Sequence, residues 1–269
     1  DLDFIQINFY QTRKKLYVTS FYRNGAYSYM AAKAMKILAI DTALNACSVA
    51  ITDGDTPLAF HHEIRSRGHA ETLLPLIRSL MSEAKLSFAD LDLIAVTVGP
   101  GTFTGLRIGL AAARGIALAA TKPCVGVTTL ESLAASVDAR DAQQQIVVPA
   151  IDARRQEVYL QSFQYTKDAH FPDSVSEPTA SLIAEASNHL IKEPLLLLGN
   201  GAALLEQSGS LNDHTFKIMD QEPNPDARIV AKIAARRAST VKIGVPPAPL
   251  YLRSPDAKLP GGLELASKS

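Results

Sequence analysis

The chain is poor in the features that mark several specialised protein classes. Its 269 residues include only two cysteines, Cys47 and Cys124, which lie far apart in apolar surroundings. Two such cysteines cannot build a disulfide scaffold or a cysteine-based zinc site, and they suit a reducing cytosol. No apolar run reaches the roughly 18 residues of a membrane span, because Arg114 interrupts the longest one. These shortages predict a cytoplasmic protein that does not span a membrane.

The chain also lacks net charge, since 27 basic residues balance 27 acidic ones. A protein whose main task is to bind nucleic acid is usually basic, so long-range attraction to RNA or DNA is not expected. Apolar residues make up 47% of the chain. That share supports a sizeable core, in one large domain or two small ones.

Residues 1–34 differ in composition from the rest. They hold eight of the 17 Phe and Tyr residues, and they carry five basic and two acidic side chains. Met35 is followed at once by an apolar strand pattern. We therefore interpret 1–34 as an extension that is not native to the fold, with a targeting presequence as the alternative.

After Met35 the predicted elements alternate between strands and helices. Two β-branched runs, Lys36–Asp41 and 47–52, flank a short polar turn and predict a hairpin. Apolar residues with a 3.6-residue period over 70–84 predict a helix. A buried strand at 93–98 is followed by a glycine-rich loop and then by a helix that ends near Ala120.

A weaker copy of this opening follows. Residues 146–152 again form an apolar strand that ends in Ile-Asp, and 157–163 return as an alternating strand. The similarity suggests an internal duplication. Further on, the pattern predicts a helix near 180–191, a strand at Leu195–Leu198 and a helix near 227–238. Hairpins followed by crossover helices, twice over, predict an α/β fold of two lobes with mixed sheets.

The glycine-rich loop at 99–105 has two interpretations. Backbone amides at the start of a helix can hold a phosphate. The spacing, however, matches neither the P-loop nor GxGxxG, and Pro100 lacks an amide donor. We favour a tight turn whose glycines allow the helix to pack closely on the strand.

The helix after this loop is almost wholly apolar, with Arg107 and Arg114 as its only charged residues. Gly105, Gly109 and Ala113 recur every four residues and form a ridge of small side chains. Such a ridge lets another helix approach closely. The helix is therefore either a partner-binding helix or the central core helix of one domain.

Histidines and nucleophiles provide no catalytic pattern. The six histidines form neither HExxH nor HxxxH, so a zinc hydrolase would lack its ligands. No serine or cysteine sits in a recognisable nucleophile elbow. The residues alone identify no catalytic group and no metal ligand.

Five segments together resemble one family closely. The stretch 96–119, VTVGPGTFTGLRIGLAAARGIALA, is the most specific of them. The chain resembles the TsaB (YeaZ) family, the accessory subunits of the bacterial tRNA threonylcarbamoyladenosine synthase, over about 35–253. The other four segments are 36–51, 66–77, 125–134 and 151–160.

This resemblance implies an actin-like (Hsp70/sugar-kinase, ASKHA) fold with two ribonuclease-H-like lobes. The expected parts are the extension 1–34, a first lobe 35–143 with the partner-binding helices, a second lobe 144–253 and an irregular tail 254–269.

The resemblance also implies two vestigial sites. In actin-like kinases, aspartates at the positions of Asp41 and Asp152 bind a metal–nucleotide, and Thr42 follows the first of them. No glycine lies in 42–46, so efficient ATP hydrolysis is not expected, and turn aspartates that cap local amides are the alternative. The catalytic relatives, TsaD, hold a metal with two histidines that fall on Thr129 and Leu133 here.

The function implied is that of a catalytically silent paralogue without a cofactor or metal. It would be a scaffold that binds the catalytic subunit TsaD as a heterodimer, together with the TsaE ATPase, and reaches tRNA through the complex. A homodimer is expected in isolation. The alternatives are a metallo-protease of the glycoprotease type and an actin-like small-molecule kinase.

Two helices that lie side by side are expected to form the partner interface. The residues predicted for it are the apolar stripe of the first helix and the small ridge of the second: Leu73, Ile77, Leu80, Met81, Gly105, Gly109, Ala112, Ala113 and Ile116.

Overall fold

A computed structural model describes most of the chain. Contacts divide it into two compact units, Asp1–Met35 and Lys36–Ser269. In the first unit, β1 (Ile7–Thr12), β2 (Lys15–Ser20) and β3 (Ser28–Ala31) form an antiparallel sheet in that order. The residues that the structure describes are 7–12, 15–20, 28–31, 34–142, 145–166, 169–221 and 223–253. The tail predicted at 254–269 lies outside them.

The second unit begins with a five-stranded sheet in the order β6-β5-β4-β7-β8. β4 pairs antiparallel with β5 and parallel with β7, so the predicted hairpin and the strand near 93–98 are both confirmed. Antiparallel pairing of β6 with β5 and parallel pairing of β8 with β7 complete a mixed sheet. The strands are β4 (Lys36–Asp41), β5 (Ala46–Asp53), β6 (Thr56–Ile64), β7 (Leu93–Thr97) and β8 (Cys124–Val127).

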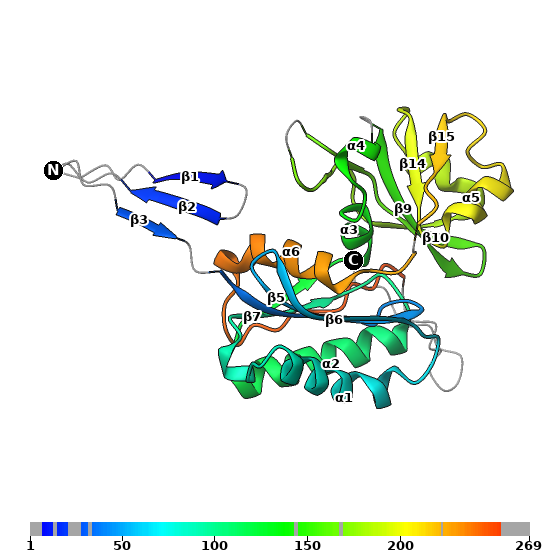
Figure 1. The fold of residues 1–269 in the computed structure, drawn as a ribbon. Coiled ribbons are helices and arrows are strands. Elements are labelled where there is room, and N and C mark those ends of the chain that lie inside the picture. The colour runs from blue at the N-terminus through cyan, green and yellow to red at the C-terminus, as the bar shows by residue number, and fades with distance from the viewer. Residues whose placement is uncertain are drawn as a thin grey trace. The chain divides into compact units, whose positions relative to one another are not determined.

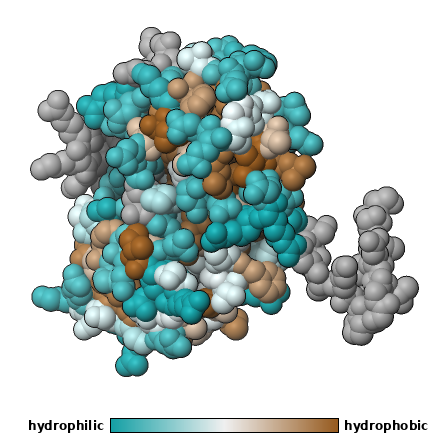
Figure 2. Space-filling view, turned by 90° about the vertical axis from the view of Figure 1, so that its right-hand side faces the viewer, coloured by the Kyte–Doolittle hydropathy of each residue, from teal (hydrophilic) through white to brown (hydrophobic). Residues whose placement is uncertain are grey.

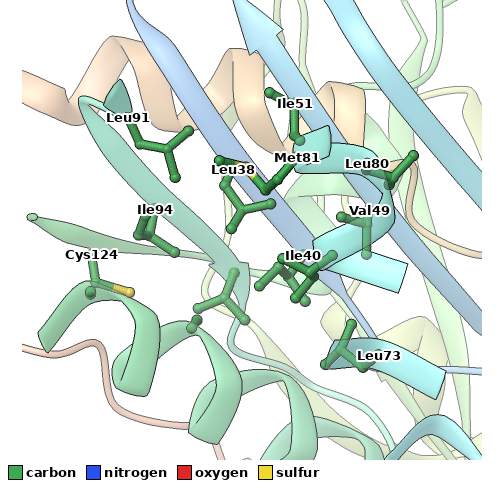
Figure 3. Close-up of a cluster of buried hydrophobic side chains, with 14 of the residues drawn as sticks. Leu38, Ile40, Val49, Ile51, Leu73, Leu80, Met81, Leu91, Ile94 and Cys124 are labelled. Atoms are coloured by element: carbon green, nitrogen blue, oxygen red, sulfur yellow. The ribbon is translucent and has the colours of Figure 1, made fainter. Parts of the chain in front are cut away.

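Helices cover both faces of this sheet (Figure 1). α1 (His69–Glu83) and α2 (Phe103–Ala120) lie side by side on one face, and α6 (Ala227–Arg237) lies on the other. The central strands β4 and β7 are buried almost throughout, as expected for a sheet covered on both sides. Figure 3 shows the core beneath α1, with Leu73, Leu80 and Met81 from the helix and Leu38, Ile40 and Val49 from the sheet.

The second sheet repeats the connectivity of the first. β9 (Ile146–Arg154) pairs antiparallel with β10 (Glu157–Leu160) and β11 (Phe163–Gln164) along its length, and parallel with β14 (Leu195–Leu198). β14 in turn pairs parallel with β15 (Phe216–Ile218). A hairpin beside parallel strands therefore occurs twice, which confirms the predicted duplication. The outer antiparallel strands are β12 (Asp173–Ser174) and β13 (Thr179–Leu182).

Short helices link these strands. They are η1 (Phe88–Asp90), α3 (Thr129–Ala134), α4 (Ala139–Ala142), η2 (Ile183–His189), α5 (Ala202–Ser208) and η3 (Ala238–Thr240). The helix predicted near 180–191 is wrong in its first part, because Thr179–Leu182 pairs with β10 and forms β13. Long-range strand pairing overrides the local helical pattern there. The rest of that segment is the 3₁₀ helix η2.

α6 packs on the first sheet although it follows the second in sequence. Its contacts are mainly with β4 and β5. The backbone amide of Ala227 donates a 3.0 Å hydrogen bond to Ser48 Oγ, and Val230, Ala231 and Ala234 are buried. The expected assignment of 144–253 to a second lobe is therefore wrong for α6, because its apolar face completes the core of the first lobe.

The segment after α6 ties the two lobes together. The amide of Leu250 donates a 2.7 Å hydrogen bond to the carbonyl of Val98 in the first lobe. Arg114 Nε, on α2, donates to the carbonyl of Pro247 at 3.1 Å. At the end of the segment, Arg253 Nη1 lies 2.7 Å from Glu157 Oε2 in the second lobe. We call residues 246–253 the C-terminal strap.

Candidate partner-binding surface

Asp41, at the end of β4, is sealed inside the protein. Its side chain is 0% exposed, and its Oδ1 accepts a 2.6 Å hydrogen bond from Thr97 Oγ1 and a 3.2 Å bond from the amide of Ala43. Oδ2 has no partner among the described residues. Burial raises the pKa of Asp41 to about 7, against the smaller opposing effect of the two hydrogen bonds. A carboxyl group so buried is poorly placed to hold a metal–nucleotide.

The glycine-rich loop closes directly over this strand end. A Cβ on Gly101 would lie 2.5 Å from the carbonyl oxygen of Ala43, and one on Gly105 would lie 2.1 Å from that of Thr42. The amide of Thr102 donates a 2.8 Å hydrogen bond to the Ala43 carbonyl. The glycines are therefore required for close packing of backbone on backbone, which confirms the packing interpretation of this loop.

In the second lobe, glycines pack in the same way against the backbone of β9. A Cβ on Gly199 would lie 2.4 Å from the Ala150 carbonyl oxygen, and the amide of Gly201 donates a 2.9 Å hydrogen bond to it. Asp152 is half-buried in the following turn and lies 3.2 Å from Arg154 Nη1. Its carboxylate also accepts from the Arg154 amide at 2.7 Å. Asp152 thus caps its own turn, as the alternative interpretation proposed.

Apolar side chains fill the region between the two sheets. One buried cluster combines Ala43, Leu44 and Leu106 of the first lobe with Val147 and Ile151 of the second. The cluster continues through Leu130 and Leu133 of α3. Asp41 and Thr42, beside Ala43 in the sequence, are likewise buried, at 0% and 1% exposed.

The positions that correspond to the TsaD metal ligands belong to this packed region. Thr129 and Leu133 are buried on α3, and Leu133 is part of the apolar cluster. Glu131, between them, forms an ion pair with Arg237 of α6. Within the described part of the chain, no group of three His, Cys, Asp or Glu residues could hold a metal ion.

The face of α1 and α2 predicted to bind a partner points into the protein. Seven of its nine residues are buried, so the prediction is wrong for them: Leu73, Ile77, Leu80, Met81, Gly105, Gly109 and Ala113. Ala112 and Ile116 are half-buried and pack against the same core. The physical reason is that the small ridge fits α2 to its own lobe, where a Cβ on Gly109 would lie 2.5 Å from Thr42 Oγ1.

The opposite face of the same two helices is exposed and includes apolar side chains. Leu74 of α1 is 50% exposed, and Leu118 of α2 is 82% exposed. Ala111 and Gly115 are exposed on α2, and a Cβ on Gly115 would meet nothing within 4 Å. Residues 111, 115 and 118 lie on one side of the helix because of their spacing. Exposed apolar residues on neighbouring helices make this side of α1 and α2 a candidate interaction surface.

An aromatic–arginine cluster lies at the start of α2. The Arg107 guanidinium carbon lies 3.6 Å from the centroid of the Phe103 ring, and the ring of Tyr251 in the C-terminal strap lies 5.9 Å from that of Phe103. Phe103 is 53% exposed. Exposed aromatic and arginine side chains are typical anchors of protein interfaces. We define the outer face as Leu74, Phe103, Arg107, Ala111, Gly115, Leu118 and Tyr251.

Length and composition alone would allow α2 to cross a membrane, with a mean hydropathy of 1.3. In this chain it packs instead against β7 and α1. Elsewhere, on the side of the molecule drawn in Figure 2, hydrophobic residues form separate patches within a mainly hydrophilic surface.

Comparisons with known proteins agree with this architecture. The TsaD family model, described as tRNA N6-adenosine threonylcarbamoyltransferase, matches residues 60–258. A Bacillus subtilis protein named tRNA threonylcarbamoyladenosine biosynthesis protein TsaB is 30% identical over 229 residues, 83% of this chain and 97% of that protein. The Escherichia coli K12 protein of the same name is 41% identical over 130 residues, 48% of this chain and about half (55%) of that protein.

A solved structure has a similar fold. YeaZ from Pseudomonas aeruginosa superimposes with a TM-score of 0.69 at 27% identity, over 81% of this chain and 100% of that one. The duplicated mixed sheets and the family match define a TsaD-like protein of two-lobed α/β fold. Within that class, the chain belongs to the TsaB (YeaZ) family.

Proposed function

We propose that the chain is a non-catalytic subunit in the biosynthesis of threonylcarbamoyladenosine in tRNA, and that it binds a catalytic TsaD-like partner. The observation that carries the proposal is the exposed apolar outer face on α1 and α2. The names of its relatives supply the pathway, since they are tRNA threonylcarbamoyladenosine biosynthesis proteins. The buried Asp41 and the leucine at position 133 favour a binding role over a catalytic one.

The partner would dock by helix packing. A relative of the same fold carries helices equivalent to α1 and α2, so two helices from each protein can pack into a four-helix arrangement. Exposed Ala111 and Gly115 allow close approach, and exposed Leu74 and Leu118 supply apolar area. A second copy of this chain would use the same face, so a homodimer in isolation would compete with the heterodimer.

The proposal extends to the setting of this complex. The heterodimer would act in the cytoplasm, would receive the TsaE ATPase, and would reach tRNA as an assembly. The modified nucleoside would be the adenosine beside the anticodon. These assignments rest on the family resemblance.

Reconstitution tests this function. A purified TsaD-like protein is given the activated threonylcarbamoyl donor, ATP, the TsaE ATPase and a tRNA transcript, with and without this chain. We expect modified adenosine only when the chain is present, and modification that is independent of the chain would contradict the proposal. Peptide hydrolysis or small-molecule phosphorylation by the chain alone would instead support the metallo-protease or kinase alternatives.

A further inference from the structure

Positive charge is concentrated in one segment of this neutral chain. Residues 223–245 contain five basic residues and one acidic residue, a net charge of +4, whereas the whole chain has 27 of each. The segment comprises α6 and the residues that flank it. The charge is therefore local and belongs to one element of the fold.

α6 is amphipathic, with an apolar face and a basic face. Ala227, Val230, Ala231, Ile233 and Ala234 are buried against the first sheet. Arg228, Lys232 and Arg236 follow one another at intervals of four residues on the other side. In an α-helix such residues form a stripe with about 6 Å of rise between neighbours. We call these three residues the basic stripe.

Aromatic rings hold both arginines of the stripe. The guanidinium carbon of Arg228 lies 3.9 Å from the centroid of the Phe60 ring, and that of Arg236 lies 5.3 Å from the centroid of the Phe171 ring. A guanidinium plane supported in this way can donate hydrogen bonds from its edge, as Arg228 does to Asp226, and its planar group is one on which a base can stack.

The three members of the stripe differ in their ion pairing. Arg228 is paired with Asp226 at 2.6 Å. Lys232 and Arg236 form no ion pair with any carboxylate that the structure describes. A polyanion would supply an ion-pair partner that no described carboxylate gives these two side chains.

A recess of about 310 Å³ opens beside the stripe, and charged residues of both signs line it: Arg228 and Lys232 are basic, Asp55 and Asp226 acidic. Pro57 and Ile229 give it apolar walls, and Thr52 contributes a buried hydroxyl without a partner among the described residues. Apolar walls with a few hydrogen-bonding groups suit an unstacked base, and basic residues beside them suit the adjoining phosphates.

We propose that the basic stripe of α6 binds RNA, contacting the phosphates of an unpaired segment of tRNA whose base enters the recess beside Lys232. This inference rests on the proposed function, which supplies tRNA as the RNA. α6 covers the face of the first sheet opposite α1 and α2 (Figure 1). RNA and the protein partner can therefore occupy the chain at the same time.

The test compares two double charge reversals of equal size. Lys232→Glu with Arg236→Glu alters the stripe, and Lys192→Glu with Lys217→Glu alters two exposed lysines of the second lobe. Binding of a labelled tRNA transcript to the full chain is followed by fluorescence anisotropy between 50 and 200 mM salt, about the range over which phosphate contacts weaken strongly. Capture of the TsaD-like partner is measured on the same samples.

The stripe variant should bind tRNA at least about tenfold more weakly, with a slope of log affinity against log salt that is smaller by about 2. The control variant should stay close to the unchanged protein. Equal losses in both variants, no loss in the stripe variant, or no tRNA binding by the unchanged chain would each overturn the inference. If the unchanged chain fails to capture the partner, the proposed function falls instead, whatever the RNA result.

A second, milder pair of substitutions separates the loss of charge from misfolding. Lys232→Gln with Arg236→Gln removes the charges without adding carboxylates, and should give an intermediate loss of tRNA affinity with unchanged partner capture. Full affinity in this folded variant would overturn the inference as well.

Discussion

Thr97 donates a 2.6 Å hydrogen bond from its hydroxyl to Oδ1 of Asp41, and both residues lie out of reach of solvent. Burial raises the pKa of Asp41 to about 7, so near neutral pH the folded protein holds much of this group as a carboxylic acid. The aspartate for which a nucleotide-binding role was an expectation is part of the core here. Its protonation is therefore linked to folding.

Replacement of Asp41 by asparagine should remove a pH dependence of stability. The carboxyl pKa is 3.8 as an isolated group and about 7 in the folded protein. The stabilisation from proton uptake is complete below about pH 4 and is lost as the pH rises through about 7. Over that range the unchanged protein should lose a few kcal/mol of unfolding free energy. Asp41→Asn keeps an acceptor for Thr97. It carries no titrating group at this position, so it should not show this loss of unfolding free energy.

Urea unfolding of both proteins at pH 5 and pH 8 measures this difference. The stability of the asparagine variant relative to the unchanged protein should rise by at least about 1 kcal/mol between the two pH values. Parallel changes in the two proteins would show that Asp41 titrates normally in the folded state.

Two glycines of α2 should respond in opposite ways to alanine. A Cβ on Gly109 would lie 2.5 Å from Thr42 Oγ1 and 3.5 Å from Val96 Cγ2, whereas a Cβ on Gly115 would meet nothing within 4 Å. Gly109→Ala should destabilise the chain by roughly 1–3 kcal/mol through overpacking. Gly115→Ala should stabilise it by up to about 1 kcal/mol through helix propensity. Thermal unfolding gives both values, and equal effects would refute the orientation of α2.

The C-terminal strap should loosen when Arg114 is removed. Nε and Nη2 of Arg114 both donate to the carbonyl of Pro247. Arg114→Ala should cost about 1–3 kcal/mol, since hydrogen bonds from charged groups are in this range. It should also speed cleavage by trypsin at Lys242 and Arg253. Arg78→Ala, at an exposed position of α1, is the control and should change neither quantity; unchanged cleavage in Arg114→Ala would contradict the role of the strap.

Removal of 1–34 should leave the rest intact. Contacts divide the chain after Met35. A chain that starts at Met35 should melt at the same temperature as the full chain and should bind its partner equally well. A clearly lower melting temperature would show that the first unit contributes to the stability of the second.

The sequence predicted the order of elements better than their orientation. Hairpins such as Lys36–Asp41 with the following strand were predictable because alternating and β-branched patterns are local signals. The ridge of Gly109 and Ala113 was also visible, but its partner is the chain's own lobe. The strongest apolar stripe of α2 packs in the chain's own core, so we place the proposed partner surface on the weaker second stripe at Leu118.

Long-range contacts explain the other differences. Thr179–Leu182 becomes a strand because β10 is available to pair with it, and α6 joins the first lobe through Ser48. The apolar cluster between the two sheets brings Leu44 and Leu106 together from different parts of the chain. None of these contacts leaves a periodic signal in a single sequence.

The most direct test of the account is the affinity of Leu118→Arg for a purified TsaD-like partner. Leu118 is 82% exposed in the isolated chain, so the variant should fold normally. In the complex it would place an unpaired charge in an apolar contact, at a cost of several kcal/mol, or orders of magnitude in Kd. Ile218→Arg, on β15 of the second lobe, is the matched control and should bind like the unchanged chain. A Leu118→Arg protein that binds the partner with unchanged Kd would contradict the assignment of α1 and α2 as the docking surface.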